Sequence, residues 1–264
     1  MKSVIGKADI LFVTLDTLRW DVAQMTMEQG RTPNLKRLIP GGWQLRHSPG
    51  SFTYAAHHAF FAGFLPTPPT PGPHPRLYAA RFPGSETTTD DTWVFDEPDV
   101  VTALANQGYH TLCVGGVGFF NRLTPLGRVL PSLFHESFWS KELGVTERES
   151  TRNQVDVAVQ AIQRRPPDQR VFLFINVSAL HQPNCMYVDG AQVDSVETQA
   201  AALEYVDSQL PRLFDFLSHR SSVFGIVCSD HGTAYGEDSF VGHRLAHPVV
   251  WNVPYAEFSL PKIG

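Results

Sequence analysis

The sequence has little cysteine and no long hydrophobic run. Its 264 residues include three cysteines, Cys113, Cys185 and Cys228, an odd number too widely spaced for a disulfide framework or a CxxC metal motif. No apolar run reaches the length of about 18 residues needed to span a membrane, and the stretch 10–16 is too short for a signal peptide. We therefore expect a protein of a reducing compartment, cytoplasmic by default, without a membrane partner.

A strong excess of charge of one sign is also lacking. The formal net charge is −5 and no run of Lys or Arg occurs, which excludes a nucleic-acid groove as the main function. Hydrophobic residues make up 42% of the chain and charged residues 18%, as in folded rather than disordered proteins. The length favours one large domain, residues 1–264. Histidine is abundant, and eleven histidines make metal chemistry worth testing.

Short apolar runs alternate with helical patterns along the chain. The runs predict buried strands over 9–16, 109–116, 171–178, 224–230 and 254–260. The helical patterns cover 99–107, 151–165 and 195–220, the last with a kink or a new first turn at Pro211. This alternation predicts a three-layer α/β/α sandwich with a mostly parallel central sheet. Six prolines within 65–78 indicate a rigid surface loop rather than a domain linker.

Three of the predicted strands end in residues able to bind a metal ion or a phosphate. The first ends at Asp16, the third leads to His181, and the fourth ends at Asp230 and His231. An aspartate at such a place is often only the cap of the next helix. Because ligands bind beyond the carboxyl ends of parallel strands, however, the three ends meet at one edge. Asp230 and His231 could bind one cation, with Gly232 letting the backbone turn away.

The order of these motifs resembles sulfatases and their relatives in the alkaline phosphatase superfamily. The resemblance starts with "DILFVTLDTLRWD" and "TPNLKRL", continues through "LANQGYHTLCVGG" and "FLFINVSALHQP", and ends with "GIVCSDHG". It covers nearly the whole chain to about Pro254 and implies an alkaline-phosphatase-like fold. After Pro254 little sequence remains, so we do not expect the smaller second domain that many sulfatases carry.

The resemblance places the nucleophile within segment 48–66, at the start of a helix, and there puts Thr53 where sulfatases carry the residue that becomes formylglycine. That modification needs a Cys/Ser-x-Pro-x-Arg pattern, which this chain lacks, so we do not expect formylglycine. A threonine here resembles the nucleotide pyrophosphatase/phosphodiesterase and lipoteichoic-acid-synthase branches, in which a metal-bound threonine attacks phosphorus. A cation and a helix N-terminus both suit that chemistry. Ser51 is the second candidate, and either residue could be only an N-cap.

One metal site is implied by the resemblance, with Asp16, Thr53, Asp230 and His231 as ligands. This set of oxygens and one nitrogen suits Mn²⁺, Zn²⁺ or Mg²⁺. A second site would need His181 with His243 or His247, and it lacks a carboxylate, because Val177 stands where the phosphodiesterase branch carries an aspartate.

The remaining histidines are candidates for contact with the substrate. His181 and His243 are expected to contact the substrate or assist proton transfer, since imidazole titrates near neutrality. His57, in the place of the sulfatases' arginine, and His247 are expected to bind the substrate. His243 or His247 could instead cap the loop before the last strand. Arg19 is expected to pair with Asp21 or Glu28 rather than with a phosphate.

These features predict a metal-dependent hydrolase or transferase acting on phosphate esters or phosphonates through a covalent intermediate on Thr53. The expected partner is a small-molecule anionic ester, and the sequence does not indicate an oligomeric state. Two alternatives stay open: a hydrolase of sulfuric esters that works without formylglycine, and a metal-binding protein that has lost catalysis and serves as a partner.

Overall fold

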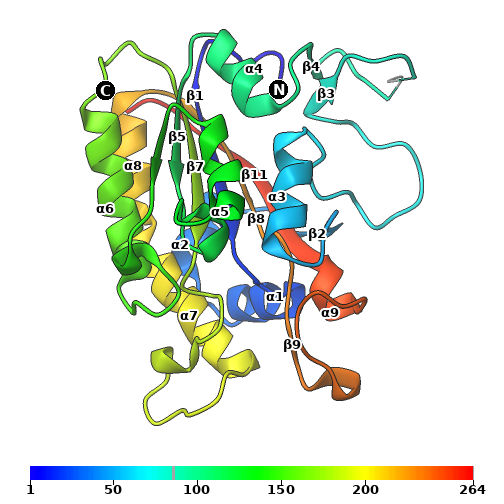
Figure 1. Ribbon diagram of the computed structural model, residues 1–264, viewed down its shortest axis with the longest axis vertical. Helices are drawn as coiled ribbons and strands as arrows, with labels where there is room; N and C mark the ends of the chain where they lie inside the picture. Colours follow the sequence, from blue (N-terminus) through cyan, green and yellow to red (C-terminus); the bar gives the residue numbers. More distant parts are fainter. Residues whose placement is uncertain (85–86, 264) are drawn as a thin grey trace.

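A computed structural model of the chain describes residues 1–84 and 87–263. Within these residues the main sheet has seven strands, in the spatial order β2-β11-β8-β1-β7-β5-β6 (Figure 1). Their bounds are β1 (Asp9–Leu15), β2 (Gln44–His47), β5 (His110–Val114), β6 (Glu136–Phe138), β7 (Val171–Val177), β8 (Val223–Cys228) and β11 (Asn252–Leu260). The pairs β8–β1, β1–β7, β7–β5 and β5–β6 are parallel, whereas β11 is antiparallel to both β8 and β2. The predicted mostly parallel sheet is confirmed.

Helices cover both faces of this sheet. One face carries α1 (Trp20–Glu28), α2 (Pro33–Leu38), α6 (Ser150–Gln163), α7 (Val196–Gln209) and α8 (Pro211–Arg220). The other carries α3 (Thr53–Phe61) and α4 (Val100–Asn106). Figure 1 shows α6 and α8 on one side of the sheet and α3 on the other. The three-layer α/β/α architecture is therefore confirmed.

Shorter elements complete the described chain. They are the strand pairs β3 (Tyr78–Ala80) with β4 (Trp93–Phe95) and β9 (Ala234–Tyr235) with β10 (Val241–Gly242), the helices α5 (Pro125–Val129) and α9 (Pro248–Trp251), and the 3-10 helices η1 (Gly118–Phe120), η2 (Pro131–Leu133), η3 (Lys141–Leu143), η4 (Cys185–Tyr187) and η5 (Glu237–Ser239). The proline-rich segment 65–78 leads from α3 into β3, and of its residues only Pro66 and Tyr78 are buried, as expected of a surface loop.

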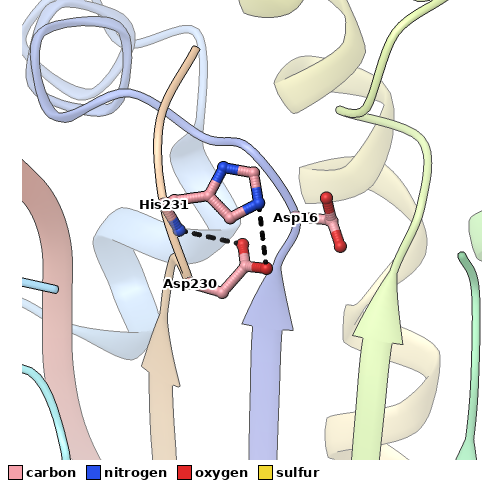
Figure 2. Close-up of side chains that lie close together, drawn as sticks. All are labelled: Asp16, Asp230 and His231. Atoms are coloured by element: carbon pink, nitrogen blue, oxygen red, sulfur yellow. Dashed lines mark hydrogen bonds and ion pairs between the residues drawn. The ribbon is translucent and has the colours of Figure 1, made fainter. Parts of the chain in front are cut away.

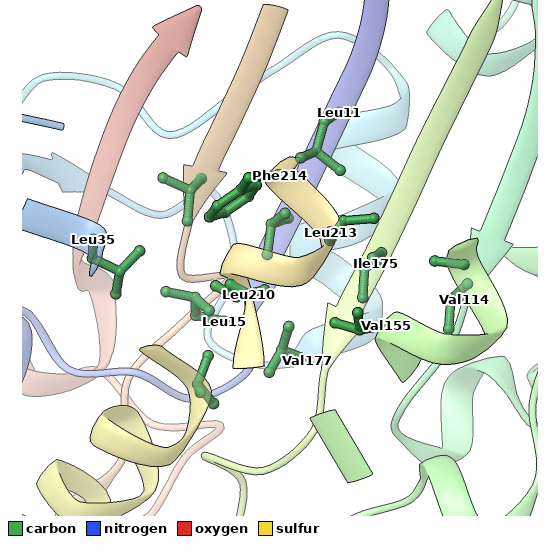
Figure 3. Close-up of a cluster of buried hydrophobic side chains, with 14 of the residues drawn as sticks. Leu11, Leu15, Leu35, Val114, Val155, Ile175, Val177, Leu210, Leu213 and Phe214 are labelled. Atoms are coloured by element: carbon green, nitrogen blue, oxygen red, sulfur yellow. The ribbon is translucent and has the colours of Figure 1, made fainter. Parts of the chain in front are cut away.

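The two sides of the central strands face different cores because successive side chains of a strand point to opposite faces. In β1, Leu11, Val13 and Leu15 pack against the first helix layer, and Ile10 and Phe12 against the second. All seven residues of β1 and of β7 are buried. The core between the sheet and the layer of α1, α2, α6, α7 and α8 includes Leu213 and Phe214 of α8 and is drawn in Figure 3. Because these strands are buried on both faces, they appear in the sequence as continuous apolar runs.

Local signals set the ends of several helices. The Asp99 carboxylate accepts the backbone N–H of Thr102 at 2.7 Å and caps α4, and Gly108 follows that helix with φ +85°. Ser195 and Thr198 form a capping box at the start of α7. Pro211 is the first residue of α8, so the long pattern 195–220 is two helices, and of the kink and the new first turn expected at this proline the second is observed.

Gly116, which follows β5, lies so close to β7 that no larger residue fits. A Cβ at this position would lie 2.5 Å from the backbone oxygen of Asn176 and 2.6 Å from Cβ of Ser178. The chain that leaves β5 is thereby held against the carboxyl end of β7.

None of the helices in residues 1–84 and 87–263 combines the length and the apolar character needed to cross a bilayer. The cytoplasmic location expected from the sequence stays a prediction.

We expect Gly116→Ala to destabilise the protein by about 1–3 kcal/mol, because the added methyl group must displace backbone atoms of β7. Gly41→Ala is the matched control, since no atom lies within 4 Å of a Cβ built there. Thermal and urea unfolding of both variants measure the effect. Equal midpoints for the wild type and Gly116→Ala would contradict the close approach.

Candidate metal centre and active site

Two carboxylates and one imidazole meet where β1 and β8 end. Asp16 directly follows β1, Asp230 lies two residues after β8, and His231 is next to it (Figure 2). Because β1 and β8 are parallel neighbours, their carboxyl ends bring these side chains together. One potential ligand atom from each of the three residues lies within 4.8 Å of the others, and all three residues are fully buried.

Each carboxylate has one oxygen held by the protein and one without a hydrogen-bond partner in the described structure. Oδ1 of Asp230 accepts the backbone N–H groups of Thr17 and His231, at 3.2 and 3.0 Å. Oδ2 of Asp16 accepts Nδ2 of Asn176 at 2.9 Å. The other oxygens, Oδ1 of Asp16 and Oδ2 of Asp230, are buried and make no hydrogen bond. Buried acceptors of this kind are costly unless a cation satisfies them, so the residues fit a divalent metal ion.

The imidazole of His231 is in the form that binds metals. Its Nδ1 lies 2.9 Å from the carbonyl oxygen of Gly232, and since a carbonyl only accepts, Nδ1 carries the proton. Nε2 is therefore the free nitrogen, 3.4 Å from Oδ2 of Asp230. Burial lowers the pKa of His231, which favours this neutral ring. Gly232 permits the arrangement, because a Cβ there would lie 1.9 Å from the carbonyl oxygen of Val249.

The same burial disfavours charge on the two carboxylates. Burial, and then the neighbouring charge of Asp230, raise the pKa of Asp16 to about 6. Burial raises the pKa of Asp230 to about 7, against backbone hydrogen bonds from Thr17 and His231 that lower it. Without a cation, the two adjacent buried carboxylates thus take up protons at a higher pH than a free aspartate does.

Thr53 lies beside this cluster, at the first position of α3. Its Oγ1 is 3.4 Å from Oδ2 of Asp16 and 3.3 Å from Nε2 of His231. The N-cap of α3 is Phe52, which offers no side-chain cap, so neither Ser51 nor Thr53 is the N-cap. The N–H groups of the first helical turn lie next to the Thr53 hydroxyl and favour negative charge there.

Above Thr53 lies a pocket with a volume of about 250 Å³. It is lined by Thr53, Val117, Gly118, Phe119, Thr124, Leu126, Gly127, Val145, His181, His243 and Arg244. The pocket therefore joins the threonine to two of the histidines expected at the site.

His181 and His243 face each other across a short distance, with ring centres 5.6 Å apart. Nδ1 of His181 donates to the carbonyl oxygen of Gln182 at 2.6 Å, which leaves its Nε2 free. Burial, and then the neighbouring His231, His181 and Arg244, lower the pKa of His243 to about 3. A neutral His243 suits contact with a substrate better than donation of a proton at neutral pH.

The comparison with known protein families agrees with this geometry. The model of the sulfatase family matches residues 8–255, nearly the whole chain. The chain belongs to the sulfatase family. No curated protein matches the sequence significantly.

Solved structures similar to this sulfatase-family chain share its fold at low sequence identity. The C-terminal periplasmic domain of the phosphoethanolamine transferase EptC from Campylobacter jejuni is 13% identical with a TM-score of 0.64, over 96% of this chain and 79% of that one. The corresponding domain of EcEptC from Escherichia coli, in a complex with Zn, is 12% identical with a TM-score of 0.60, over 97% and 74%. The lipoteichoic acid synthase LtaP from Listeria monocytogenes is 14% identical with a TM-score of 0.58, over 99% and 67%.

His57 of this sulfatase-family chain lies away from the pocket, contrary to the expectation that it contacts the substrate. It is fully buried, with Nδ1 2.7 Å from the carbonyl oxygen of Thr53 and Nε2 3.0 Å from Oγ1 of Thr14. The aromatic rings around it are those of Phe60, Phe61, Phe120 and Phe174. Burial lowers its pKa to about 3. The neutral ring supports the start of α3 from the core.

His247 is a capping residue, which corrects its assignment as a substrate-binding residue. Its Nδ1 accepts the backbone N–H of Val249 at 3.2 Å and caps α9, while Nε2 lies 3.1 Å from Asp238. It does not line the pocket. Arg19 makes the expected ion pair with Asp21 and a second one with Glu237, so it is not a free anion site.

The described residues contain one cluster of three possible metal ligands, Asp16, Asp230 and His231. A second site built on His181 is not supported in this part of the chain.

Two site residues were not predicted from the sequence. Asn176 of β7 holds Asp16, and it stands out in the sequence as the one amide inside the apolar run "VFLFINV". Arg244 lines the pocket, and its guanidinium lies 5.3 Å from the centre of the Phe52 ring. No carboxylate of the described chain lies within ion-pair distance of Arg244, so its charge is available to an anion. In the sequence, only its position directly after His243 indicated that Arg244 could belong to the site.

The raised pKa values predict how pH changes the stability of the metal-free protein. Unfolded aspartate has a pKa of about 3.9, well below the values of Asp16 and Asp230 in the folded protein. Protonation therefore favours the folded state, so the metal-free protein should become more stable as pH falls from about 7 to about 4. A bound cation should reverse the trend, because it needs both carboxylates ionised.

Melting temperatures measured across this range, with chelator and with Mn²⁺ or Zn²⁺, test the prediction. The control is Asp230→Asn in chelator, in which the part of the trend due to Asp230 should be lost. A metal-free wild type with the same pH profile as Asp230→Asn would contradict the assignment.

Proposed function

We propose that the chain is a metal-dependent hydrolase or transferase of phosphate esters or phosphonates that forms a covalent intermediate on Thr53. One observation carries the proposal. The Thr53 hydroxyl lies at the start of a helix, within 3.4 Å of both a carboxylate and an imidazole of the ligand cluster, and lines a pocket. A hydroxyl placed this way is a nucleophile rather than a helix cap.

The residues that would hold the cation are Asp16, Thr53, Asp230 and His231. A divalent cation bound there would lower the pKa of the Thr53 hydroxyl and offset negative charge on the phosphoryl oxygens. Three oxygens and one nitrogen suit Mn²⁺, Zn²⁺ or Mg²⁺, and we propose a single site.

The first step forms a bond between Oγ1 of Thr53 and phosphorus and breaks the bond between phosphorus and the leaving oxygen. The proton lost by the Thr53 hydroxyl passes through solvent to the departing alcohol. The N–H groups of the first turn of α3 and the Arg244 guanidinium bind the charged phosphoryl oxygens. In the second step water, or an acceptor alcohol, attacks phosphorus and releases Thr53. His181 takes the proton of that attacking group through Nε2, since its Nδ1 donates to Gln182, and the same proton returns to Oγ1 of Thr53 when the bond between phosphorus and Oγ1 breaks.

Membership of the sulfatase family supports chemistry on anionic esters, and it favours a second candidate function. This is the hydrolysis of sulfuric esters in the same pocket, without formylglycine. The residue in place of the formylglycine precursor is a threonine, which favours phosphoryl transfer. The third possibility is a metal-binding protein without catalysis. It is disfavoured because Thr53, the ligand cluster and Arg244, which has no carboxylate partner in the described chain, all meet at one pocket.

Thr53→Ala should lower turnover of aryl phosphate mono- or diesters by at least about 10³-fold, because the attacking oxygen is removed. Thr53→Ser keeps a hydroxyl and should retain a measurable part of the rate. Turnover is measured with Mn²⁺, Zn²⁺ or Mg²⁺ and with chelator, and bound metal is determined by elemental analysis of each variant.

Full metal-dependent turnover by Thr53→Ala would refute the nucleophile. Preferred turnover of aryl sulfates over aryl phosphates would establish the second candidate instead. A protein that turns over neither ester but binds a divalent ion would support the third possibility.

A further inference from the structure

The pocket above Thr53 has two chemically different faces. Its polar face consists of Thr53, His181, His243 and Arg244, and its apolar face of Val117, Phe119, Leu126 and Val145, with Thr124 as the one polar side chain among the lining residues of 117–127. At about 250 Å³ the pocket is smaller than the sites of drug-sized ligands, which start at about 300 Å³. A small substrate bound here must touch both faces.

Residues 117–127, which carry most of the apolar face, are attached to β7 at one end and fold tightly on themselves at the other. The backbone N–H of Val117 donates to Oδ1 of Asn176 at 3.1 Å, so the wall is attached to the same residue that holds Asp16. At the other end, Gly127 N–H donates to Oγ1 of Thr124 at 3.0 Å. A Cβ at Gly127 would lie 2.3 Å from Oδ1 of Asn121, so the segment folds tightly on itself here.

Aromatic rings extend this face toward the nucleophile. The ring of Phe119 lies 5.4 Å from that of Tyr54 and 6.3 Å from that of Phe52, the residues on either side of Thr53. Such contacts hold Phe119 in one place beside the reacting centre.

The segment that carries Leu126 also has other apolar side chains exposed to solvent. Leu126 is 47% exposed, and Leu123 and Val129 on the same segment are 70% and 39% exposed. Exposed Thr124 and Arg128 alternate with these side chains along the segment, so Leu126, which lines the pocket, is the residue that offers partly exposed apolar surface to a ligand.

We propose that this wall binds the alcohol part of the ester, and that the alcohol is apolar, an aryl or alkyl group rather than a sugar or another polyol. The inference rests on the proposed function, since it assigns the leaving group of that reaction. The hydroxyl groups of a polyol would lose water against Val117, Phe119 and Leu126 without gaining hydrogen bonds, whereas an aryl or alkyl group is favoured by burial of apolar surface. Phe119 and Leu126 are thereby specificity-determining residues.

The test compares three phosphate monoesters, 2-naphthyl phosphate, hexyl phosphate and glycerol phosphate, by release of inorganic phosphate with the metal-loaded protein. The wild type should prefer the naphthyl or the hexyl ester to glycerol phosphate by at least about tenfold in kcat/KM. The preference between naphthyl and hexyl distinguishes an aryl from an alkyl alcohol. A preference for glycerol phosphate, or none, would overturn the proposal.

Phe119→Ala and Leu126→Ser should each reduce this ratio by about tenfold, mainly through KM of the apolar ester. Phe64→Ser is the matched control, because Phe64 is 49% exposed, much like Leu126, and does not line the pocket. Leu126 is half exposed, so its replacement keeps the test valid if Phe119→Ala fails to fold. An unchanged ratio in Leu126→Ser and in folded Phe119→Ala would overturn the role of the wall.

Binding of free 2-naphthol, measured by calorimetry, separates this inference from the proposed function. If no ester is turned over, the proposed function fails. The apolar wall then stands if naphthol binds to the wild type and to Phe64→Ser but not to Leu126→Ser, and it falls if naphthol does not bind to the wild type.

Discussion

The site depends on two buried carboxylates placed side by side at the ends of neighbouring strands. Asp16 and Asp230 are fully buried, and each keeps one oxygen without a hydrogen bond in the described structure. Close negative charges in a medium of low dielectric repel each other, so the pair is stable only with protons or with a cation. The contacts from Thr17, Asn176 and His231 orient the pair without neutralising it.

The central strands could be predicted because they are buried on both faces and therefore appear as unbroken apolar runs. β1 and β7 are examples, and Pro211 correctly indicated a new helix. The edge strands β2 and β6 could not be found in this way. They are four and three residues long and partly exposed, so they lack an apolar signature and form only because a neighbouring strand pairs with them.

The site was predictable where strand ends carry its residues, and Asp16, Thr53, Asp230 and His231 do lie together. His57 shows the limit of this reasoning. Its spacing from Thr53 placed it one turn along the helix, but only the packing of α3 on the sheet decides that it faces the core. Arg244 was missed for a related reason. Its charge is available to an anion only because no carboxylate of the described residues lies near it, and that is a property of the folded chain.

The central place of β1 in the sheet also constrains how the protein folds. β1 is made first, yet its two neighbours are β7 and β8, and the hydrogen bond between Thr17 and Asp230 joins residues 213 positions apart. Contacts of such separation close large loops and form slowly. A nascent chain cannot bring the proposed metal ligands together until His231 has been synthesised, so the site forms late in folding, and β11, which follows it in the sequence, joins the sheet later still.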